Sequence, residues 1–353
     1  MRSNKNNFRI KSIWITDVAN QGQSGVLNEK LLGNDPSWSD HARDLLHLIN
    51  IHRRDMPRPL VAIGHSLGGQ VLCDVALMHP RLFATMVLIE PVLQHKLSAS
   101  PNPGHILAHT STYRRDIWPS RNAAAEGYKR SKFYQTWDPR VIERLVRFGL
   151  RDLPTLIYPA VPPGSGEQPV TLSTTKHQEV FTFLRPNYQG SGYNSRPVNR
   201  KTHPDVHPGL PPIYPFYRPE ILRTFFRLPE LRPSVFYMFG ELSYLSSTEL
   251  MEARLSTTGT GVGGSGGRPE GKVKEISLKG VGHLVPMEAV EDCADAASEW
   301  IGKEIQIWSV DEEEHRQEWS KKSLLEKQTI DKKWKEMVGA SRPATKLATE
   351  SKL

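Results

Sequence analysis

The sequence predicts an α/β fold, a doubly wound and mostly parallel sheet with helices on both faces, and three observations predict it. Residues 59–66 form a short apolar run and residues 84–92 a second, mostly apolar one, which is typical of strands buried on both faces of a parallel sheet. Residues 67–80 between them have helical periodicity and end at a proline. Strands and helices alternate again after residue 233, so one sheet accounts for both halves of the chain.

The elements before residue 59 are predicted in the following order. Residues 8–18 alternate apolar and polar side chains and include β-branched ones, which predicts a strand. Residues 20–25 are rich in Gly and Ser and predict a turn. Residues 35–54 then place leucines at helical spacing after two candidate N-caps, Asp35 and Ser37, and predict a helix.

Residues 93–230 interrupt this alternation. They are rich in Pro, Arg and aromatic residues, with helical patches near 122–150 and 174–185 and an irregular stretch at 186–219. An insertion between two strands of one sheet explains this order better than a second domain that follows the first. The expected parts are an N-terminal part of the core at 1–93, a cap at 94–232, a C-terminal part of the core at 233–302 and a charged tail at 303–353.

The C-terminal part of the core is predicted as two further strands and two helices. The strands are expected at 234–241 and 272–280, and the helices near 247–255 and 287–302. Residues 311–338 then predict one long helix, because acidic side chains fill its first turn and lysines its end. Ile330, Trp334 and Met337 are candidates to pack on the body, and residues 339–350 are expected to be unstructured.

Composition excludes several classes of function. The net charge of +8 is spread along the chain without a basic stripe interleaved with aromatic residues, so nucleic-acid binding is not predicted. No apolar run approaches the roughly 18 residues that span a bilayer, and the N-terminus lacks the apolar region of a signal peptide. Cys73 and Cys293 form no disulfide or metal pattern, so we expect a reducing compartment, no metal and no cofactor.

A glycine-rich stretch at residues 259–267 contains a formal G-x-G-x-x-G at Gly259, Gly261 and Gly264. A dinucleotide-phosphate cradle needs a strand before this pattern and a helix that opens at its last glycine. Here a helical stretch precedes the pattern, so the sequence favours a flexible loop.

Ser66 is the candidate nucleophile. It is the centre of Gly64-His65-Ser66-Leu67-Gly68, between a buried strand and a helix that starts at once, which is the setting of a nucleophile elbow. Gly64 and Gly68 are expected to let the turn close, and the Leu67 N–H is expected to face the oxyanion. The five-residue pattern also occurs by chance in turns, so it gains weight from this context and from a suitable histidine downstream.

His283 is the candidate base. It follows an extended segment and Gly282, and a helix begins near Pro286, so its loop can bring the imidazole over the serine. An ordinary exposed loop histidine would look the same if it stood alone. His65 and His79 are expected to be structural residues around the elbow and its helix.

The acid that orients the imidazole has two candidates. Glu90 ends the strand next to the nucleophile strand and is favoured. In the segment after the following strand, FGELSYLSS, the usual position is Ser243, and Glu241 is the acid nearby. Glu288 and Asp17 are expected to cap local turns.

Several segments together resemble fungal peroxisomal α/β-hydrolases of the serine esterase and lipase type, a group that includes hydrolases of the AK- and AF-toxin clusters of plant-pathogenic fungi. The segments are 13–50, 56–69, 77–83, 88–92, 259–267 and 280–288. The resemblance implies an α/β-hydrolase core, a cap between the sixth and seventh strands of that fold, Ser66 as nucleophile and His283 as base. That fold also places a strand and a His-Gly loop before residues 8–18. Their absence predicts missing early strands and a weakened oxyanion hole.

The last three residues, Ser351, Lys352 and Leu353, match the peroxisomal import tripeptide, so we expect an import receptor as a partner. Together these observations predict a peroxisomal serine hydrolase that cleaves an acyl ester or acyl thioester in the making of a fatty-acid-derived metabolite such as a toxin. The alternative is a weakly active or inactive hydrolase-like protein that binds an acyl ligand or a partner.

Overall fold

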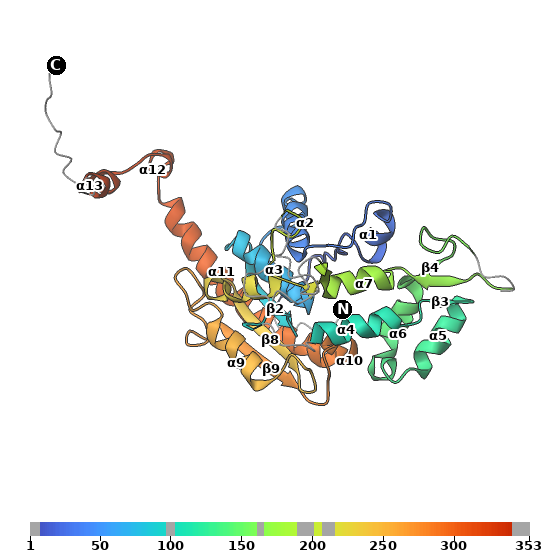
Figure 1. Ribbon diagram of the computed structural model, residues 1–353. Helices are drawn as coiled ribbons and strands as arrows, with labels where there is room; N and C mark the ends of the chain where they lie inside the picture. Colours follow the sequence, from blue (N-terminus) through green and yellow to red (C-terminus); the bar gives the residue numbers. More distant parts are fainter. Residues whose placement is uncertain (1–7, 97–102, 161–165, 189–200, 207–215, 341–353) are drawn as a thin grey trace, which may run out of the picture. The chain divides into compact units, whose positions relative to one another are not determined.

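The computed structural model describes the chain at residues 8–96, 103–160, 166–188, 201–206 and 216–340 (Figure 1). The chain forms two compact units, Met1–Ile305 and Gln306–Leu353. In the first unit a sheet carries helices on both faces, as predicted for an α/β protein.

The central sheet has four parallel strands in the order β1-β2-β8-β9. Their bounds are Leu60–His65 for β1, Phe83–Ile89 for β2, Ser234–Gly240 for β8 and Val273–Leu278 for β9. Every residue of β8 is buried, and β2 is buried at all positions but one, because both are inner strands. The strands predicted at 59–66, 84–92, 234–241 and 272–280 are therefore confirmed.

Three helices pack on one face of this sheet: α2 (Trp38–Ile51), α3 (Leu67–Met78) and α9 (Thr248–Thr257). The first part of α11 (Val290–Ser320) covers the other face. There Trp300 stacks on Phe236 at 5.4 Å between ring centroids. Its indole N–H donates to the Thr85 hydroxyl at 2.8 Å. The helix predicted at 287–302 is thus confirmed, although it extends further.

The strand predicted over residues 8–18 is wrong. These residues form no ladder, and Ile13 and Ile15 are 73% and 87% exposed. In the described part of the chain β1 pairs with β2 alone, and Ile63 on β1 is 55% exposed. An alternating run becomes a strand only where a neighbour accepts its backbone hydrogen bonds, and here none does. The short helix α1 (Gly22–Leu27) replaces the turn predicted at 20–25.

The insertion lies between β2 and β8, and Figure 1 shows its helices α4, α5, α6 and α7 grouped beside the strands. Strands β3, β5 and β4 form a small antiparallel sheet, on which α5 and α6 pack. The helical bounds are Pro103–Tyr113 (α4), Arg121–Arg130 (α5), Tyr134–Thr136 (η1), Pro139–Phe148 (α6), Lys176–Phe183 (α7), Glu220–Phe225 (α8) and Leu228–Glu230 (η4). The strands are Ile117–Trp118 (β3), Leu150–Asp152 (β4), Val170–Leu172 (β5), Arg185–Pro186 (β6) and Phe216–Tyr217 (β7).

The single long helix predicted for residues 311–338 is also wrong. Helix α11 ends at Ser320, and two short helices follow, α12 (Leu324–Gln328) and α13 (Lys332–Ala340). Ser323 starts α12 with a capping box, in which its side chain accepts the Glu326 N–H and the Glu326 carboxylate accepts the Ser323 N–H. This arrangement favours a new helix start over continuation.

The glycine-rich stretch is an ordered loop rather than the flexible one expected. The N–H groups of Gly259 and Gly261 donate to Leu228 and Pro229 carbonyls, both at 2.9 Å. A Cβ on Gly264 would lie 2.4 Å from two carbonyl oxygens, so the glycine permits close packing. These amides are therefore engaged and do not form a phosphate cradle.

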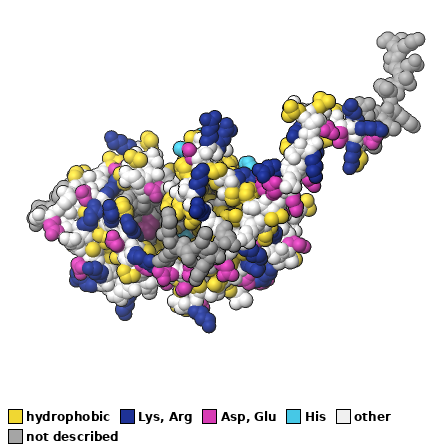
Figure 2. Space-filling view, turned by 180° about the vertical axis from the view of Figure 1, so that it is seen from behind, with side chains coloured by type: hydrophobic (Ala, Val, Ile, Leu, Met, Phe, Trp, Pro, Cys, Tyr) yellow, Lys and Arg dark blue, Asp and Glu magenta, His cyan; other side chains and the backbone are white. Residues whose placement is uncertain are grey.

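The charged side chains on the surface are spread out, as the sequence predicts. On the face that Figure 2 shows, Lys and Arg side chains are dispersed among Asp and Glu rather than gathered in a stripe. Across the described residues, no helix combines the length and the apolar character needed to cross a membrane.

Candidate active site

Ser66 stands at the sharp turn between β1 and α3. Its φ of 53° and ψ of −117° are in a region that residues other than glycine rarely adopt. The Ser66 N–H donates to the Ile89 carbonyl at 2.9 Å, which fixes the turn to the end of β2. The side chain is thereby lifted from the sheet at the N-terminus of α3, where the helix dipole favours negative charge.

Close backbone packing explains the glycines around Ser66. A Cβ on Gly64 would lie 2.6 Å from the backbone of Gly68, and a Cβ on Gly69 would lie 2.7 Å from the side chain of Pro91. A Cβ on Gly68 would meet nothing within 4 Å. The two glycines that the turn requires are therefore Gly64 and Gly69, not Gly64 and Gly68 as expected.

His283 lies in the loop between β9 and the short helix α10 (Val285–Glu288). Its Nε2 is 3.0 Å from the Ser66 hydroxyl, and its Nδ1 is 3.1 Å from Oε2 of Glu90. The structure therefore brings Ser66, His283 and Glu90 into one hydrogen-bonded chain. In this arrangement Nδ1 carries the proton and Nε2 accepts from the serine hydroxyl.

Glu90 follows β2 directly, with a φ of 47°, and is fully buried. Its carboxylate accepts the Gly240 N–H at 2.7 Å, the Ser246 hydroxyl at 2.5 Å and the Ser243 hydroxyl. Burial alone would raise the pKa of Glu90, but the hydrogen bonds from His283, these serines and Gly240 outweigh it and lower the pKa below its usual 4.5. The acid is therefore held ionised beside the imidazole.

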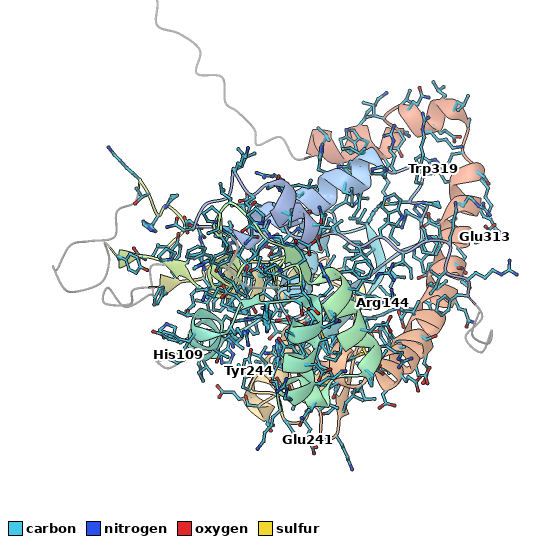
Figure 3. All side chains as sticks on the ribbon, turned by 90° about the vertical axis from the view of Figure 1, so that its right-hand side faces the viewer. His109, Arg144, Glu241, Tyr244, Glu313 and Trp319 are labelled. Carbon is cyan, nitrogen blue, oxygen red and sulfur yellow. The ribbon has the colours of Figure 1, made fainter. Side chains whose placement is uncertain are left out.

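The alternative acid, Glu241, is turned away from the imidazole. Its carboxylate accepts the Gly280 N–H at 2.8 Å, and Figure 3 shows it at the outside of the molecule. The carboxylate at His283 is thus that of Glu90. Ser243, at the position where an acid was considered, supports Glu90 instead. Glu288 and Asp17 cap local turns as predicted, by accepting the N–H groups of Gly282 and Gln23.

Two aromatic side chains flank the His283 ring, and neither has a local sequence signal that marks it as part of the site. The His65 ring lies 5.0 Å from it and the Tyr244 ring 5.3 Å, between centroids. His65 Nε2 is 2.9 Å from the His283 carbonyl oxygen. Burial, and then the neighbouring His283, lower the pKa of His65 to about 4, so its ring is neutral near pH 7.

One oxyanion donor follows directly from the elbow. Leu67 begins α3, so its N–H lies at the helix N-terminus directly after Ser66. A backbone N–H of Gln21 or Gly22 would be an alternative source of the second donor. However, the Gln21 N–H donates to Val18 at 2.8 Å and the Gly22 N–H donates to the Thr174 hydroxyl at 2.8 Å. Both amides are thus engaged elsewhere.

The insertion reaches the loop of His283 through α6. The Asp138 N–H, at the start of this helix, donates to the Met287 carbonyl of α10 at 2.8 Å. The aromatic residues in the last part of the insertion that were candidates to line an acyl pocket are Tyr214, Phe216, Tyr217, Phe225 and Phe226. Tyr217 and Phe225 are buried in packing, Phe226 is exposed, and Tyr214 lies outside the described residues. Among the side chains described, no group of three or more His, Cys, Asp or Glu is placed to hold a metal.

Known proteins resemble the chain in sequence and in fold. Residues 12–146 match the family described as serine aminopeptidase, S33. The chain is 38% identical over 343 residues to the type I acyl-CoA thioesterase mpaH of Penicillium roqueforti (strain FM164). This match covers 93% of this chain and 77% of that protein. It is 25% identical over 284 residues to the abhydrolase domain-containing protein AKT2 of Alternaria alternata, covering 79% and 97% of the two chains.

Among solved structures, the peroxisomal α/β-hydrolase Lpx1 of Saccharomyces cerevisiae has a similar fold. The TM-score is 0.56 at 17% sequence identity, and the match covers 92% of this chain and 73% of that one. At this identity the likeness concerns the fold alone.

Proposed function

The chain belongs to the α/β-hydrolase family that includes the mpaH thioesterases of Penicillium and AKT2 of Alternaria, and from this premise we propose that it is a serine hydrolase that cleaves acyl-CoA thioesters. The observation that carries the proposal is the hydrogen-bonded chain from Ser66 through His283 to Glu90, at 3.0 and 3.1 Å. The name of the thioesterase relative supports the thioester over the ester as substrate.

The geometry supports a two-step acyl transfer. The Ser66 oxygen attacks the acyl carbon while His283 Nε2 takes the hydroxyl proton, and the buried Glu90 carboxylate stabilises the imidazolium through Nδ1–H. The carbon–sulfur bond breaks, and the proton on Nε2 passes to the leaving thiolate, which leaves an acyl-serine. Water then attacks the acyl-serine with His283 as base, and the fatty acid and the free serine are released.

A fluorophosphonate probe and thiol release from acyl-CoA test this function. We expect the wild-type chain to be labelled and to release CoA thiol, and we expect Ser66→Ala to do neither. Labelling that persists in Ser66→Ala would move the nucleophile to another residue. A matched control is Ser256→Ala, at an exposed position of α9, which is expected to retain labelling and thiol release.

The second candidate is a hydrolase-like protein that binds an acyl ligand and turns it over slowly or not at all. The engaged amides of Gln21 and Gly22 favour it, because loss of one oxyanion donor costs on the order of 10²–10³ in rate. Probe labelling without measurable thiol release, together with saturable binding of an acyl-CoA, would favour this candidate over an efficient thioesterase.

We also propose that the chain acts in the peroxisome, in the making of a fatty-acid-derived secondary metabolite. The tripeptide Ser351-Lys352-Leu353, which lies outside the described residues, supports this address. A fluorescent protein fused to the N-terminus should colocalise with peroxisomes and become cytosolic when the tripeptide is deleted. Unchanged localisation after deletion would refute the address.

A further inference from the structure

His65 and Ser66, two successive residues of the elbow, both hydrogen-bond to His283. The Ser66 hydroxyl lies 3.0 Å from Nε2 of its ring, and the His65 Nε2 lies 2.9 Å from its carbonyl oxygen. Residues 65 and 66 therefore contact His283 at two places. Ser66 contacts its imidazole ring, and His65 contacts its backbone carbonyl.

The chemistry of this second contact fixes the state of His65. A carbonyl oxygen can only accept, so His65 Nε2 must be the donor and must carry a proton. The rings of His65 and His283 are 5.0 Å apart, and the titratable groups that act on His65 are His283 and the more distant Glu90. A neutral donor suits this place, because a second positive charge would oppose the imidazolium that His283 forms during catalysis.

The sheet order shows why such a contact matters. Ser66 follows β1 and His283 follows β9, and these are the two outermost strands of the order β1-β2-β8-β9. Two strands therefore separate the reacting groups, and any relative movement of the strands changes the distance between them.

The two residues before His283 in this loop have hydrogen bonds of their own. The Leu242 N–H donates to the Val281 carbonyl at 2.9 Å, and the Gly282 N–H donates to the Glu288 carboxylate at 3.1 Å. These contacts tie residues 281 and 282 to the loop after β8 and to α10. The contact from His65 ties residue 283 itself to β1, the strand that carries the nucleophile.

We propose that His65 is a positioning residue, which donates a hydrogen bond to the His283 carbonyl and so sets the distance between His283 Nε2 and the Ser66 hydroxyl. It takes no part in proton transfer. This inference rests on the proposed serine hydrolase function. It predicts that the N–H donor at this place is required, while the imidazole ring as such is not.

The test compares three variants of the full chain on one acyl-CoA substrate. His65→Phe keeps a ring and loses the donor, and we expect kcat to fall by about tenfold to a hundredfold with KM within about threefold of wild type, because a displacement near 1 Å can cost about 10²-fold. His65→Gln presents an amide N–H near the position of Nε2 and is expected to recover most of kcat. His79→Phe, at the exposed C-terminal end of α3, is the control and should match wild type.

A pH profile and thermal melting separate positioning from other roles. In His65→Phe we expect the plateau of kcat to fall while the acidic limb of kcat/KM keeps its position, since His283 still supplies the base. A limb that moves by more than about one pH unit would show that His65 shares in proton transfer and would overturn the proposal. Melting curves of the three variants show whether each is folded at the assay temperature. If a His65 variant is not folded, His65→Asn, which has a shorter amide, replaces it. The kcat of His65→Asn is expected to lie between those of His65→Phe and His65→Gln.

The outcomes distinguish the two proposals. An active wild-type chain with an equally active His65→Phe overturns the positioning role and leaves the hydrolase function intact. Equal losses in His65→Phe and His65→Gln also overturn it, because the donor would then not be what matters. A wild-type chain that shows neither probe labelling nor thiol release overturns the hydrolase function and the positioning role with it.

Discussion

At the scale of single residues, the carboxylate of Glu90 is the most heavily bonded group of the site. It accepts from Gly240, Ser243 and Ser246 as well as from His283. Glu90→Gln would turn either an amide N–H or a single carbonyl towards Nδ1 and lose the charge that stabilises the imidazolium. We expect kcat to fall by about 10³- to 10⁴-fold. Thiol release from acyl-CoA measures it.

The control for this prediction is Glu241→Gln, which alters the hydrogen bond to Gly280 alone and should keep kcat within about twofold. Equal losses in the two variants would argue that the acid is not Glu90.

The lowered pKa of His65 makes stability depend on pH. In the folded chain the pKa is about 4, against 6.5 for the ordinary side chain. Between these values the unfolded chain binds a proton that the folded chain does not, so the stability from this residue is lost as the pH falls from 6.5 towards 4. The full difference is about 3 kcal/mol.

We therefore expect the stability advantage of wild type over His65→Gln in urea unfolding to shrink between pH 7 and pH 5. His79→Gln, at an exposed position, should show no such change relative to wild type. A pH-independent difference for His65→Gln would mean that His65 is charged or exposed in the folded chain.

The sequence pointed to Ser66 and His283 as candidates because each has a local signal. An apolar strand precedes Ser66 and an extended segment precedes His283, and a helix follows each of them. The serines that support Glu90 lie about 150 residues away in the chain, and no local pattern links them to it. The role of His65 was missed for the same reason, since its partner is a carbonyl 218 residues away.

At the scale of elements, the elbow makes a sharp prediction about its three glycines. Ala at Gly64 or Gly69 would press on the Gly68 backbone or on Pro91 and should cost about 1–3 kcal/mol in urea unfolding, with reduced probe labelling of Ser66. Ala at Gly68 meets open space inside a helix and should be neutral or stabilising by up to about 1 kcal/mol. A Gly68→Ala variant as damaged as Gly64→Ala would contradict the packing described for the turn.

The elements that the sequence predicted correctly are those with a signal in one segment. The buried strands are continuous apolar runs, and packing on two sides leaves them no other state. The prediction of a strand at residues 8–18 was wrong because a half-polar strand depends on a neighbouring strand, and the sequence of the segment does not reveal whether one is present. The break after α11 did carry a signal, Ser323 three residues before Glu326, which the charge pattern obscured.

At the scale of the whole molecule, an ionic cluster around the buried Arg185 ties the insertion to the core. Arg185 of β6 donates to Asp35, just before α2, at 2.5 and 2.9 Å and to Asp205 at 2.5 Å, and its guanidinium lies over the Tyr217 ring. Glu220 lies 3.6 Å away and is fully buried. Burial raises the pKa of Asp35, but the hydrogen bonds and charge of Arg185 outweigh burial and lower it, so this carboxylate is ionised.

Arg185→Met should destabilise the chain by about 2 kcal/mol in urea unfolding, because Asp35 and Asp205 lose their cation and Glu220 keeps Arg218 alone. Arg140→Met removes an exposed pair with Asp138 and should cost less than about 1 kcal/mol. Similar small losses in both variants would show that the cluster is hydrated. Composition could not have predicted this tie, since it joins residues about 150 apart in sequence.

The left-handed backbone at the active site bears on how this chain has evolved. Ser66 and Glu90 are the non-glycine residues with positive φ in the described part of the chain, and such strain costs on the order of 1–3 kcal/mol each. Mutational drift without selection for hydrolysis would be expected to replace them with glycine, which adopts this backbone freely. We expect Ser66→Gly to melt at a higher temperature than Ser66→Ala, while at Ser256, inside α9, alanine should exceed glycine. A higher melting temperature for Ser66→Ala than for Ser66→Gly would mean that the backbone of the elbow is not strained. The expected order would mean that Ser66 and Glu90 are retained at a cost in stability, as selection for hydrolysis would retain them.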